Sequence, residues 1–599
     1  MTTGIWESDD VWDVRRAVTT AAGAHRDLAA YNEAGVLEAA DVHVARRVCA
    51  VAGDTDPRSA LAVALAVRAV RHGSVCLSLD DVAELAPELP WPATEDWRTA
   101  LSTSRVCAAG VLAVEHGLVY LDRYRAQEQQ VADDLVARVS RPAPAVDDRL
   151  LAAALDRLYP DDRYAEQRAA CAGAATRWTT VLTGGPGTGK TTTVARILAV
   201  LTEQLGPDAR IALAAPTGKA AARLQEQVLA AGRDLPTTDA ARLEGLRATT
   251  IHRLLGFRRD NHTRFRHDRS HRLPHDLVVV DETSMVSLTM MARLLEAVRP
   301  DARLVLVGDP DQLASVEAGA VLDDLVTGFR DTPDSPVVEL GTVHRFGATI
   351  GELAAALRVG DADAAIAVLR AGHDAVGWVD SDDPADAERA IRESALPAAR
   401  AVREDAVAGE AAAALQALDR HRLLTPHRDT VRWWNSRIEQ WLREAEPEAA
   451  DLLRDRMYAG RPLLVTRNDA GLGVHNGDTG VVVRGGGGRV RAVLAGASGP
   501  IELAPGRLAD VETMHAMTIH KSQGSQAHEV TVLLPDADSR LLTRELLYTA
   551  VTRAQGGVRL IGSEESLRAA LARRAQRASG LQRRLAGSLD SAETTRTRR

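Results

Sequence analysis

Cysteine, aromatic side chains and long apolar runs are all scarce in this chain of 599 residues. Its four cysteines, Cys49, Cys76, Cys107 and Cys171, are too widely spaced for a C-x-x-C metal clamp and too few to cross-link so long a chain. We expect buried, reduced thiols, although distant cysteines that converge in a fold leave an iron–sulfur cluster open as an alternative. No run of about eighteen uncharged apolar residues occurs, which argues against a membrane span.

An excess of positive charge is also lacking, because the formal net charge is −9. This balance excludes wholesale electrostatic wrapping of nucleic acid, so any such contact must be local, in a groove where a few donors converge. The first residues, MTTGIWESDDVWDV, are acidic where a signal peptide would be basic and then apolar. We therefore expect a cytoplasmic protein.

The patterns that are present predict an α/β protein of three or four domains. Residues 1–139 have apolar positions at helical spacing, and the proline-containing segment 140–149 is typical of a linker. From 150 to 345, apolar runs such as TTVLTGG, IALAAPTG, LVVVDE and RLVLVGD alternate with helical segments, which predicts a parallel sheet covered on both faces.

A second strand-and-helix domain is expected over residues 346–575. Within it, residues from about 460 to 510 have the pattern of short antiparallel strands, which fits a small inserted β-barrel, with a tight turn at Gly485 to Gly488. We predict a polar basic tail over 576–599, disordered at its final TTRTRR.

A glycine-rich segment between a strand and a helix carries the clearest chemical signal. The motif G-x-x-x-x-G-K-[ST] is matched by Gly184, Gly185, Pro186, Gly187, Thr188, Gly189, Lys190 and Thr191. Glycines let backbone N–H groups approach phosphate oxygens, and the helix N-terminus adds positive partial charge. We predict that these residues and Thr192 bind ATP, with Lys190 at the β- and γ-phosphates and Thr191 on Mg²⁺.

Two further apolar strands end in polar side chains. Asp281 and Glu282 follow one of them, where Asp281 is placed to hold Mg²⁺ and Glu282 to polarise the attacking water. Gln312 follows the other, in GDPDQL, and is a candidate contact of the γ-phosphate. Separately these segments also fit a solvated strand end and a simple turn, so the assignments depend on the phosphate-binding loop.

Taken together, these motifs resemble superfamily 1 helicases of the 5′-to-3′ class, over residues 150 to 565. The resemblance implies two RecA-like motor domains driven by ATP, and it carries roles to particular residues. In YAEQRAA, Gln167 would read the adenine. VHRF and YTAVTRA look like the motifs whose arginines, Arg345 and Arg553, reach the γ-phosphate from the second domain. An arginine finger is worth about 10³ to 10⁵ in rate.

The same resemblance predicts a grip on single-stranded DNA through its phosphates, because a motor has to ignore sequence. The DNA-binding candidates are Thr217, His252, Thr518, His520 and Lys521. For the two histidines, a helix cap or a satisfied core position is the alternative. The arginine-rich segment 256–272 fits a strand-separating pin hairpin and a solvated basic loop equally well.

Within the superfamily, the segments GRPLLVTRND and VHNGDTG, the N-terminal region and the C-terminal ASGL resemble RecD-type helicases. This implies RecB-like and RecC-like partner subunits, one of which would carry nuclease activity. The region before the motor is too short for the extended segment of stand-alone RecD-like helicases, which remain the main alternative. A structural or ATP-switch subunit that does not translocate is a further alternative, opposed by the intact Lys190, Glu282, Arg345 and Arg553.

Overall fold

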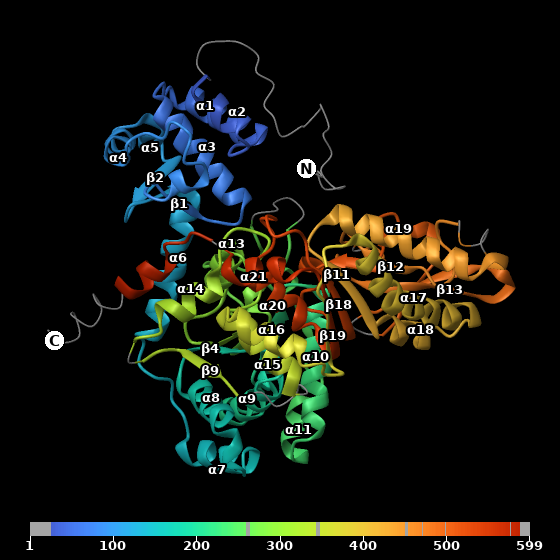
Figure 1. Cartoon of the computed structure of the whole chain (residues 1–599). Coiled ribbons are helices and arrows are strands. Elements are labelled where there is room, and N and C mark those ends of the chain that lie inside the picture. Colours follow the sequence, from blue (N-terminus) through green and yellow to red (C-terminus); the bar gives the residue numbers. More distant parts are fainter. Residues whose placement is uncertain are drawn as a thin grey trace.

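The computed structural model describes residues 26–587, with gaps at 259–263, 333, 343–347, 450–452, 454, 470, 497–498 and 576. Three lobes are visible (Figure 1): an N-terminal lobe, a central α/β domain and a second α/β domain extended by an antiparallel sheet. Within the described part of the chain, no helix is both long and apolar enough to cross a membrane.

The N-terminal lobe is helical, as predicted, but it also holds a small sheet. Its helices pack around Trp97, which is fully buried and donates from Nε1 to the carbonyl of Arg58 at 2.9 Å. Three short strands form an antiparallel sheet in the order β1-β3-β2. Their brevity explains why helical periodicity dominated the sequence pattern. The elements are α1 (Arg26–Glu33), α2 (Ala39–Ala52), α3 (Pro57–Arg71), β1 (Cys76–Ser78), α4 (Thr94–Ser102), α5 (Arg105–Ala108), β2 (Leu112–Glu115) and β3 (Leu118–Leu121).

The first α/β domain is built on a parallel sheet of six strands in the order β6-β5-β7-β8-β4-β9. The four apolar runs singled out in the sequence are its strands β4, β5, β7 and β8, so this prediction is confirmed. Its strands are β4 (Thr179–Gly184), β5 (Ile211–Ala215), β6 (Ala248–Thr250), β7 (Leu277–Val280), β8 (Arg303–Gly308) and β9 (Val337–Leu340). Its helices are α7 (Asp148–Leu158), α8 (Ala165–Thr176), α9 (Lys190–Leu205), α10 (Gly218–Arg233), α11 (Thr237–Leu243), α12 (Ile251–Leu255), α13 (Leu288–Ala297) and α14 (Val321–Gly328).

The order of the strands in this sheet positions the polar loops. Every residue of β4, β7 and β8 is buried, because helices cover both faces of a parallel sheet. These three strands are neighbours and run in the same direction. The loops that follow them therefore meet at the carboxyl edge of the sheet, where ligands bind in open α/β folds.

The second α/β domain has a parallel sheet of five strands in the order β10-β19-β18-β11-β17. Its strands are β10 (Val376–Val379), β11 (His421–Thr425), β17 (Ala516–Thr518), β18 (Ala527–Leu533) and β19 (Ala554–Ile561). Its helices are α15 (Ala348–Val359), α16 (Ala362–Arg370), α17 (Pro384–Ala408), α18 (Ala411–Leu418), α19 (Arg428–Ala445), α20 (Arg544–Val551) and α21 (Glu564–Ala572). Two parallel-sheet domains are thus present, as the sequence predicted.

An antiparallel sheet of five strands is inserted between α19 and β17, in the order β15-β14-β13-β12-β16. The strands are β12 (Pro462–Val465), β13 (Thr479–Arg484), β14 (Val490–Leu494), β15 (Ile501–Leu503) and β16 (Val511–Thr513). The predicted turn at Gly485 to Gly488 joins β13 to β14. β15 and β16 form the edges of this order, so closure into a barrel stays a prediction.

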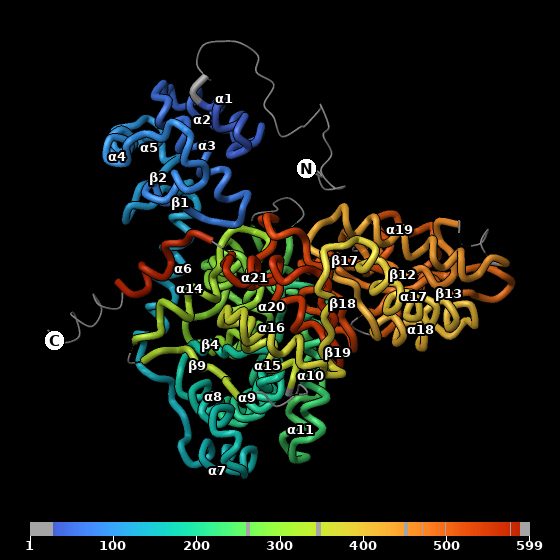
Figure 2. Tube along the Cα trace, viewed as in Figure 1, coloured from blue at the N-terminus to red at the C-terminus, as the bar shows by residue number. Residues whose placement is uncertain are grey.

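Two segments cross between lobes in a way that the sequence did not predict. The long helix α6 (Asp122–Val139) leaves the N-terminal lobe and packs on the first α/β domain, where buried Arg138 donates to Thr179 Oγ1 at 2.8 Å. Residues 577–587 return from the second α/β domain to lie beside α6, as the tube view shows (Figure 2).

The expected polar tail from residue 576 is therefore wrong for residues 577–587. Leu581 and Leu585 are fully buried in the core that the first α/β domain shares with α6, and the Arg584 side chain is only 2% exposed. Leu581 and Leu585 have the four-residue spacing of one helix face, but the arginines around them made the segment look polar in the sequence. Residues 588–599, including TTRTRR, lie outside the described residues.

The segment 256–272 has the beginnings of a hairpin. Phe257 pairs with Phe265 through an antiparallel bridge, and Arg266 donates its backbone N–H to the Gly256 carbonyl at 2.8 Å. Residues 259–263, where the tip of a pin would be, lie outside the described residues. The role as a strand-separating pin remains a prediction.

Candidate nucleotide site

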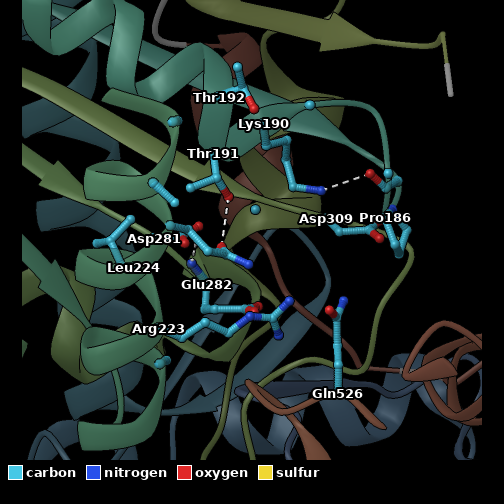
Figure 3. Close-up of a pocket in the computed structure, with 18 of the residues that line it drawn as sticks. Pro186, Lys190, Thr191, Thr192, Arg223, Leu224, Asp281, Glu282, Asp309 and Gln526 are labelled. Carbon is cyan, nitrogen blue, oxygen red and sulfur yellow. Dashed lines mark hydrogen bonds between the residues drawn. The ribbon is translucent and has the colours of Figure 1, made fainter. Parts of the chain in front are cut away.

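A cavity of about 410 Å³ lies at the carboxyl edge of the first sheet, against the second α/β domain. The loops after β4, β7 and β8 contribute one side, as predicted from their positions in the sheet. α10 contributes a second side, and the second domain contributes Gln526 and Arg553. Figure 3 shows Lys190, Asp281, Glu282 and Asp309 gathered around this space, with Gln526 approaching from the opposite side.

The backbone of residues 184–189 has the conformation that a phosphate-binding loop requires. Gly187 and Gly189 have φ values of 83° and 85°, in the left-handed region that side chains disfavour. A Cβ at Gly184 would come within 2.7 Å of the Leu340 carbonyl oxygen. The loop leads directly into α9, which begins at Lys190, and the first residues of α9 line the cavity. The Lys190 ammonium donates to the carbonyls of Gly184 and Gly185.

Asp281 and Glu282 lie beside this loop, as predicted. Burial, with the charge of Glu282, raises the pKa of Asp281 to about 6, while Lys190 and Arg223 oppose the shift. Glu282 has φ 51° and ψ 42°, a left-handed conformation that costs a non-glycine residue of order 1 kcal/mol. Backbone strain of this kind clusters at functional sites. Glu282 stands two positions after Val280, the last residue of the buried strand β7.

The two α/β domains are in direct contact at the edge of the cavity. Arg553 Nη2 donates to Gln312 Oε1 at 2.8 Å, and Gln312 Nε2 donates to Asp309 Oδ2 at 2.8 Å. Tyr548, from α20, donates from its hydroxyl to the same Asp309 oxygen at 3.1 Å. Burial raises the pKa of Asp309 and lowers that of Arg553. Gln312 and Arg553 are thus brought together, although 241 positions separate them.

Gln167 is buried near the same loop and donates from Nε2 to the Thr188 carbonyl at 3.3 Å. The amide nitrogen of Gln227 donates to Thr191 Oγ1 at 3.1 Å. In this orientation, the amide oxygen of Gln227 accepts from Arg223 at 3.1 Å. The Thr191 hydroxyl and the half-buried Asp281 carboxylate are hard oxygen ligands that suit Mg²⁺. The donor set on the cavity wall therefore fits a metal–nucleotide complex.

Five lining or supporting residues had not been assigned a role from the sequence: Arg223, Gln227, Asp309, Gln526 and Tyr548. Asp309 has the signal that marked Asp281, a carboxylate directly after a buried strand. Tyr548 stands within the segment YTAVTRA already singled out around Arg553, and Gln526 lies five residues after Lys521. Arg345 lies outside the described residues, so its position stays a prediction.

The five candidates for DNA contact lie on both domains. Thr217 caps α10 by accepting from the Ala220 N–H, and Thr518 accepts from the Lys521 N–H at 3.2 Å. Lys521 also forms an ion pair with Glu512 at 2.8 Å. A Cβ at Gly524 would lie 3.7 Å from Thr217 Oγ1, so two of the segments meet across the domain boundary. His252 is exposed and stacks edge-on with Phe265.

His520 lies in the short 3₁₀ turn that follows β17, next to Thr518. Burial and the neighbouring Arg577 and Arg428 lower its pKa, so the neutral ring is favoured at pH 7. The four cysteines are free, and three of them, Cys49, Cys76 and Cys171, are buried.

Family models match three parts of the chain. An AAA domain matches residues 167–318, which include the phosphate-binding loop, Asp281, Glu282 and Gln312. A UvrD-like helicase C-terminal domain matches residues 513–561, which include Arg553. The N-terminal domain of RecBCD enzyme subunit RecD matches residues 33–120, in the N-terminal lobe.

Curated relatives match nearly the whole chain. RecBCD enzyme subunit RecD of Mycobacterium tuberculosis is 57% identical over 569 residues, covering 93% of this chain and 96% of the relative. The same subunit of Mycolicibacterium smegmatis is 57% identical, covering 92% and 98%. The ATP-dependent RecD2 DNA helicase of Deinococcus radiodurans is 32% identical, covering 66% of this chain and 48% of the relative. On this identity and coverage, the chain belongs to the family of RecBCD enzyme subunit RecD.

Proposed function

We propose that this chain is the 5′-to-3′ motor subunit of a RecBCD-type helicase and nuclease that processes DNA ends in recombinational repair. Membership of the RecD family makes it an ATP-dependent DNA helicase. The observation that carries the mechanism is the contact between Arg553 and Gln312, which joins the two domains beside Lys190 and Glu282. Residues that reach the γ-phosphate from opposite domains let hydrolysis alter the domain interface.

ATP would be bound chiefly by the first domain. Gln167 would recognise the adenine, and the backbone N–H groups of residues 184–189 would receive the phosphates. Lys190 would turn from the carbonyls of Gly184 and Gly185 to the β- and γ-phosphates. Thr191 and Asp281 would hold Mg²⁺, which when bound neutralises charge on the phosphates.

Hydrolysis would use Glu282 to accept a proton from the attacking water. Arg553, and Arg345 by resemblance, would stabilise charge that develops on the transferring phosphoryl group. Arg553 is suited to this because its guanidinium is buried, where electrostatic interactions are strong.

ATP binding and hydrolysis would also move the proposed DNA-binding residues of the two domains relative to one another. Thr217 and His252 lie on the first domain, whereas Thr518, His520 and Lys521 lie on the second. Opening and closing of the nucleotide cleft therefore changes the spacing between two groups of phosphate contacts. Such a motion advances the motor along a single strand without reading bases.

We further propose a heterotrimer with RecB-like and RecC-like subunits, with nuclease activity in a partner. The printed names of the relatives support this assignment. A stand-alone helicase like RecD2 is the alternative; this chain spans about half the length of that relative. We propose a cytoplasmic location, because ATP and DNA are both available there.

The polarity and the need for partners are tested with one set of substrates. Unwinding of duplexes with a 5′ overhang and of duplexes with a 3′ overhang is measured for the full-length chain, first alone and then after co-purification with its native partners. We expect the 5′ overhang to be preferred, and Lys190→Ala, which lacks the phosphate-binding ammonium, to unwind neither. Preference for the 3′ overhang would contradict the polarity, and a monomer with full unwinding activity and no co-purifying subunit would contradict the complex.

A further inference from the structure

The hydroxyl of Tyr548 crosses the domain boundary to reach two residues that line the nucleotide cavity, Asp309 and Gly185. Tyr548 is 2% exposed and stands in α20, five residues before Arg553. Its hydroxyl donates to Asp309 Oδ2 at 3.1 Å. A Cβ built on Gly185 would lie only 3.1 Å from that hydroxyl oxygen. One side chain of the second domain therefore hydrogen-bonds to the loop after β8 and leaves no room for a side chain at Gly185 of the phosphate-binding loop.

Asp309 determines how the Gln312 amide is turned. The two Asp309 oxygens accept from the Tyr548 hydroxyl and from the Asp311 N–H, and the group of Gln312 that donates to this carboxyl is the amide NH₂. The amide oxygen is then left for Arg553, which donates to it at 2.8 Å. The reverse orientation would set the amide NH₂ against the guanidinium, where neither group accepts.

The four side chains form a continuous hydrogen-bonded path with both ends on the second domain. It runs from Tyr548 to Asp309, then to Gln312 and Arg553, and the Asp311 N–H donates to the second oxygen of Asp309 at 3.1 Å. Every member of the path is buried, with at most 7% exposure. Buried polar networks of this kind are stiff, because a broken bond leaves an unsatisfied group away from water.

We propose that Tyr548 is a positioning residue for ATP hydrolysis. Through Asp309 it holds the Gln312 amide in the orientation that keeps Arg553 directed into the nucleotide cavity. This inference rests on the roles proposed above for Gln312 and Arg553. Tyr548 acts through these groups and takes no proton from the reaction, so its loss should slow turnover while ATP binding by the first domain is retained.

The test compares ATP hydrolysis, stimulated by single-stranded DNA, in the full-length chain and in Tyr548→Phe, Asp309→Asn and the double variant. Tyr548→Phe should lower kcat about tenfold, the effect of losing one hydrogen bond to a charged group, with KM for ATP within about twofold of the parent. Asp309→Asn should also lower kcat. The double variant should lose much less than the product of the two single effects, because both act on one path.

Tyr458→Phe is the matched control. Tyr458 is also buried and donates to a carboxylate, Glu439 at 3.2 Å, but it lies in the segment before β12, away from the cavity. We expect unchanged kcat in this variant. A Tyr548→Phe protein with the parent thermal midpoint and the parent kcat would overturn the inference, as would equal losses in Tyr548→Phe and Tyr458→Phe.

Arg553→Ala, measured in parallel, separates the inference from the function on which it rests. Slow hydrolysis in Arg553→Ala together with full activity in Tyr548→Phe would refute the positioning role alone. Full activity in Arg553→Ala would refute the proposed arginine finger, and the positioning role with it.

Discussion

Arg553 of the second α/β domain donates a hydrogen bond to Gln312 of the first, with 2.8 Å between Nη2 and Oε1. Its other two nitrogens, Nε and Nη1, donate to the carbonyls of Thr549 and Ser525 in the second domain. A second contact lies nearby, where Leu313 donates its N–H to Thr549 Oγ1 at 2.8 Å. Movement of one domain relative to the other therefore stretches or breaks hydrogen bonds next to the phosphate-binding loop.

Replacement of the interdomain arginine should separate catalysis from nucleotide binding. In Arg553→Ala we expect kcat for ATP hydrolysis to fall about 10³-fold, because the charge that stabilises the phosphoryl group is lost. The affinity for a non-hydrolysable ATP analogue should change little, since the binding loop is intact. Steady-state kinetics and analogue titration measure the two effects.

Arg553→Lys provides the control for charge alone. A lysine keeps the positive charge but lacks the planar fork of donors that serves Gln312 and two carbonyls together. We expect only a small recovery of kcat. A full recovery would mean that charge without geometry is sufficient, which contradicts the arrangement described here.

The C-terminal segment 577–587 should stabilise the docking of the N-terminal lobe. Arg584 forms ion pairs with Glu115 at 2.8 Å and with fully buried Glu128 at 3.4 Å, and Glu128 also accepts from the Gly580 N–H at 3.0 Å. Arg584→Ala leaves the Glu128 charge buried without this cation, a change that costs about 3 kcal/mol or more. We expect a lower thermal midpoint and faster proteolysis after residue 576.

Arg583→Ala is the control for the docking prediction. Arg583 is the exposed neighbour of Arg584 and donates to the His116 carbonyl at 3.1 Å. Its loss should leave both the thermal midpoint and the proteolysis rate near those of the parent. Equal behaviour of the two variants would show that the ion pairs of Arg584 do not hold this segment.

The second α/β domain should lose stability in mild acid through two half-buried histidines, His421 and His515. Burial lowers the pKa of His421 to about 4 and that of His515 to about 3, below the ordinary value of 6.5. The unfolded chain then binds more protons than the folded one, so stability is full above pH 6.5 and falls as the pH falls. Each histidine costs at most about 1.4 kcal/mol per pH unit in this range.

Thermal midpoints measured from pH 7 to pH 5 test this prediction. His421→Gln and His515→Gln remove the titration while keeping an amide near Thr531 and Tyr458, the present partners of the two rings. Both variants should show a shallower decline than the parent. An unchanged slope would assign the acid sensitivity to other groups.

The sequence was most informative where chemistry and backbone geometry restrict the residue type. The strands β4, β5, β7 and β8 were predicted because a parallel strand covered on both faces is largely apolar along its length. The phosphate-binding loop was predicted because φ values such as those of Gly187 and Gly189 require glycine. The chain has only three lysines: Lys190 is in the phosphate-binding loop, Lys521 is a DNA-binding candidate, and Lys219 stands two residues after the candidate Thr217.

Residues that act through a neighbour were less accessible to sequence reasoning. Asp309 and Tyr548 are ordinary residues locally, and nothing in their spacing shows that they share one hydrogen bond. The same holds for Arg584, whose buried carboxylate partner Glu128 lies 456 positions away. Arginine is abundant in this chain, so its identity does not mark an ion-paired or a catalytic position.

The sequence by itself determined the two parallel-sheet domains, the ATP-binding loop and the order of the helicase motifs, because each depends on local periodicity or on residues close together in the chain. Only the tertiary structure decided that Arg553 meets Gln312, that Tyr548 reaches Asp309 and that the C-terminal segment packs beside α6. These contacts join residues far apart in the chain. They depend on how the lobes pack, and the burial of apolar surface that drives such packing is non-directional, so it leaves no local pattern in the sequence.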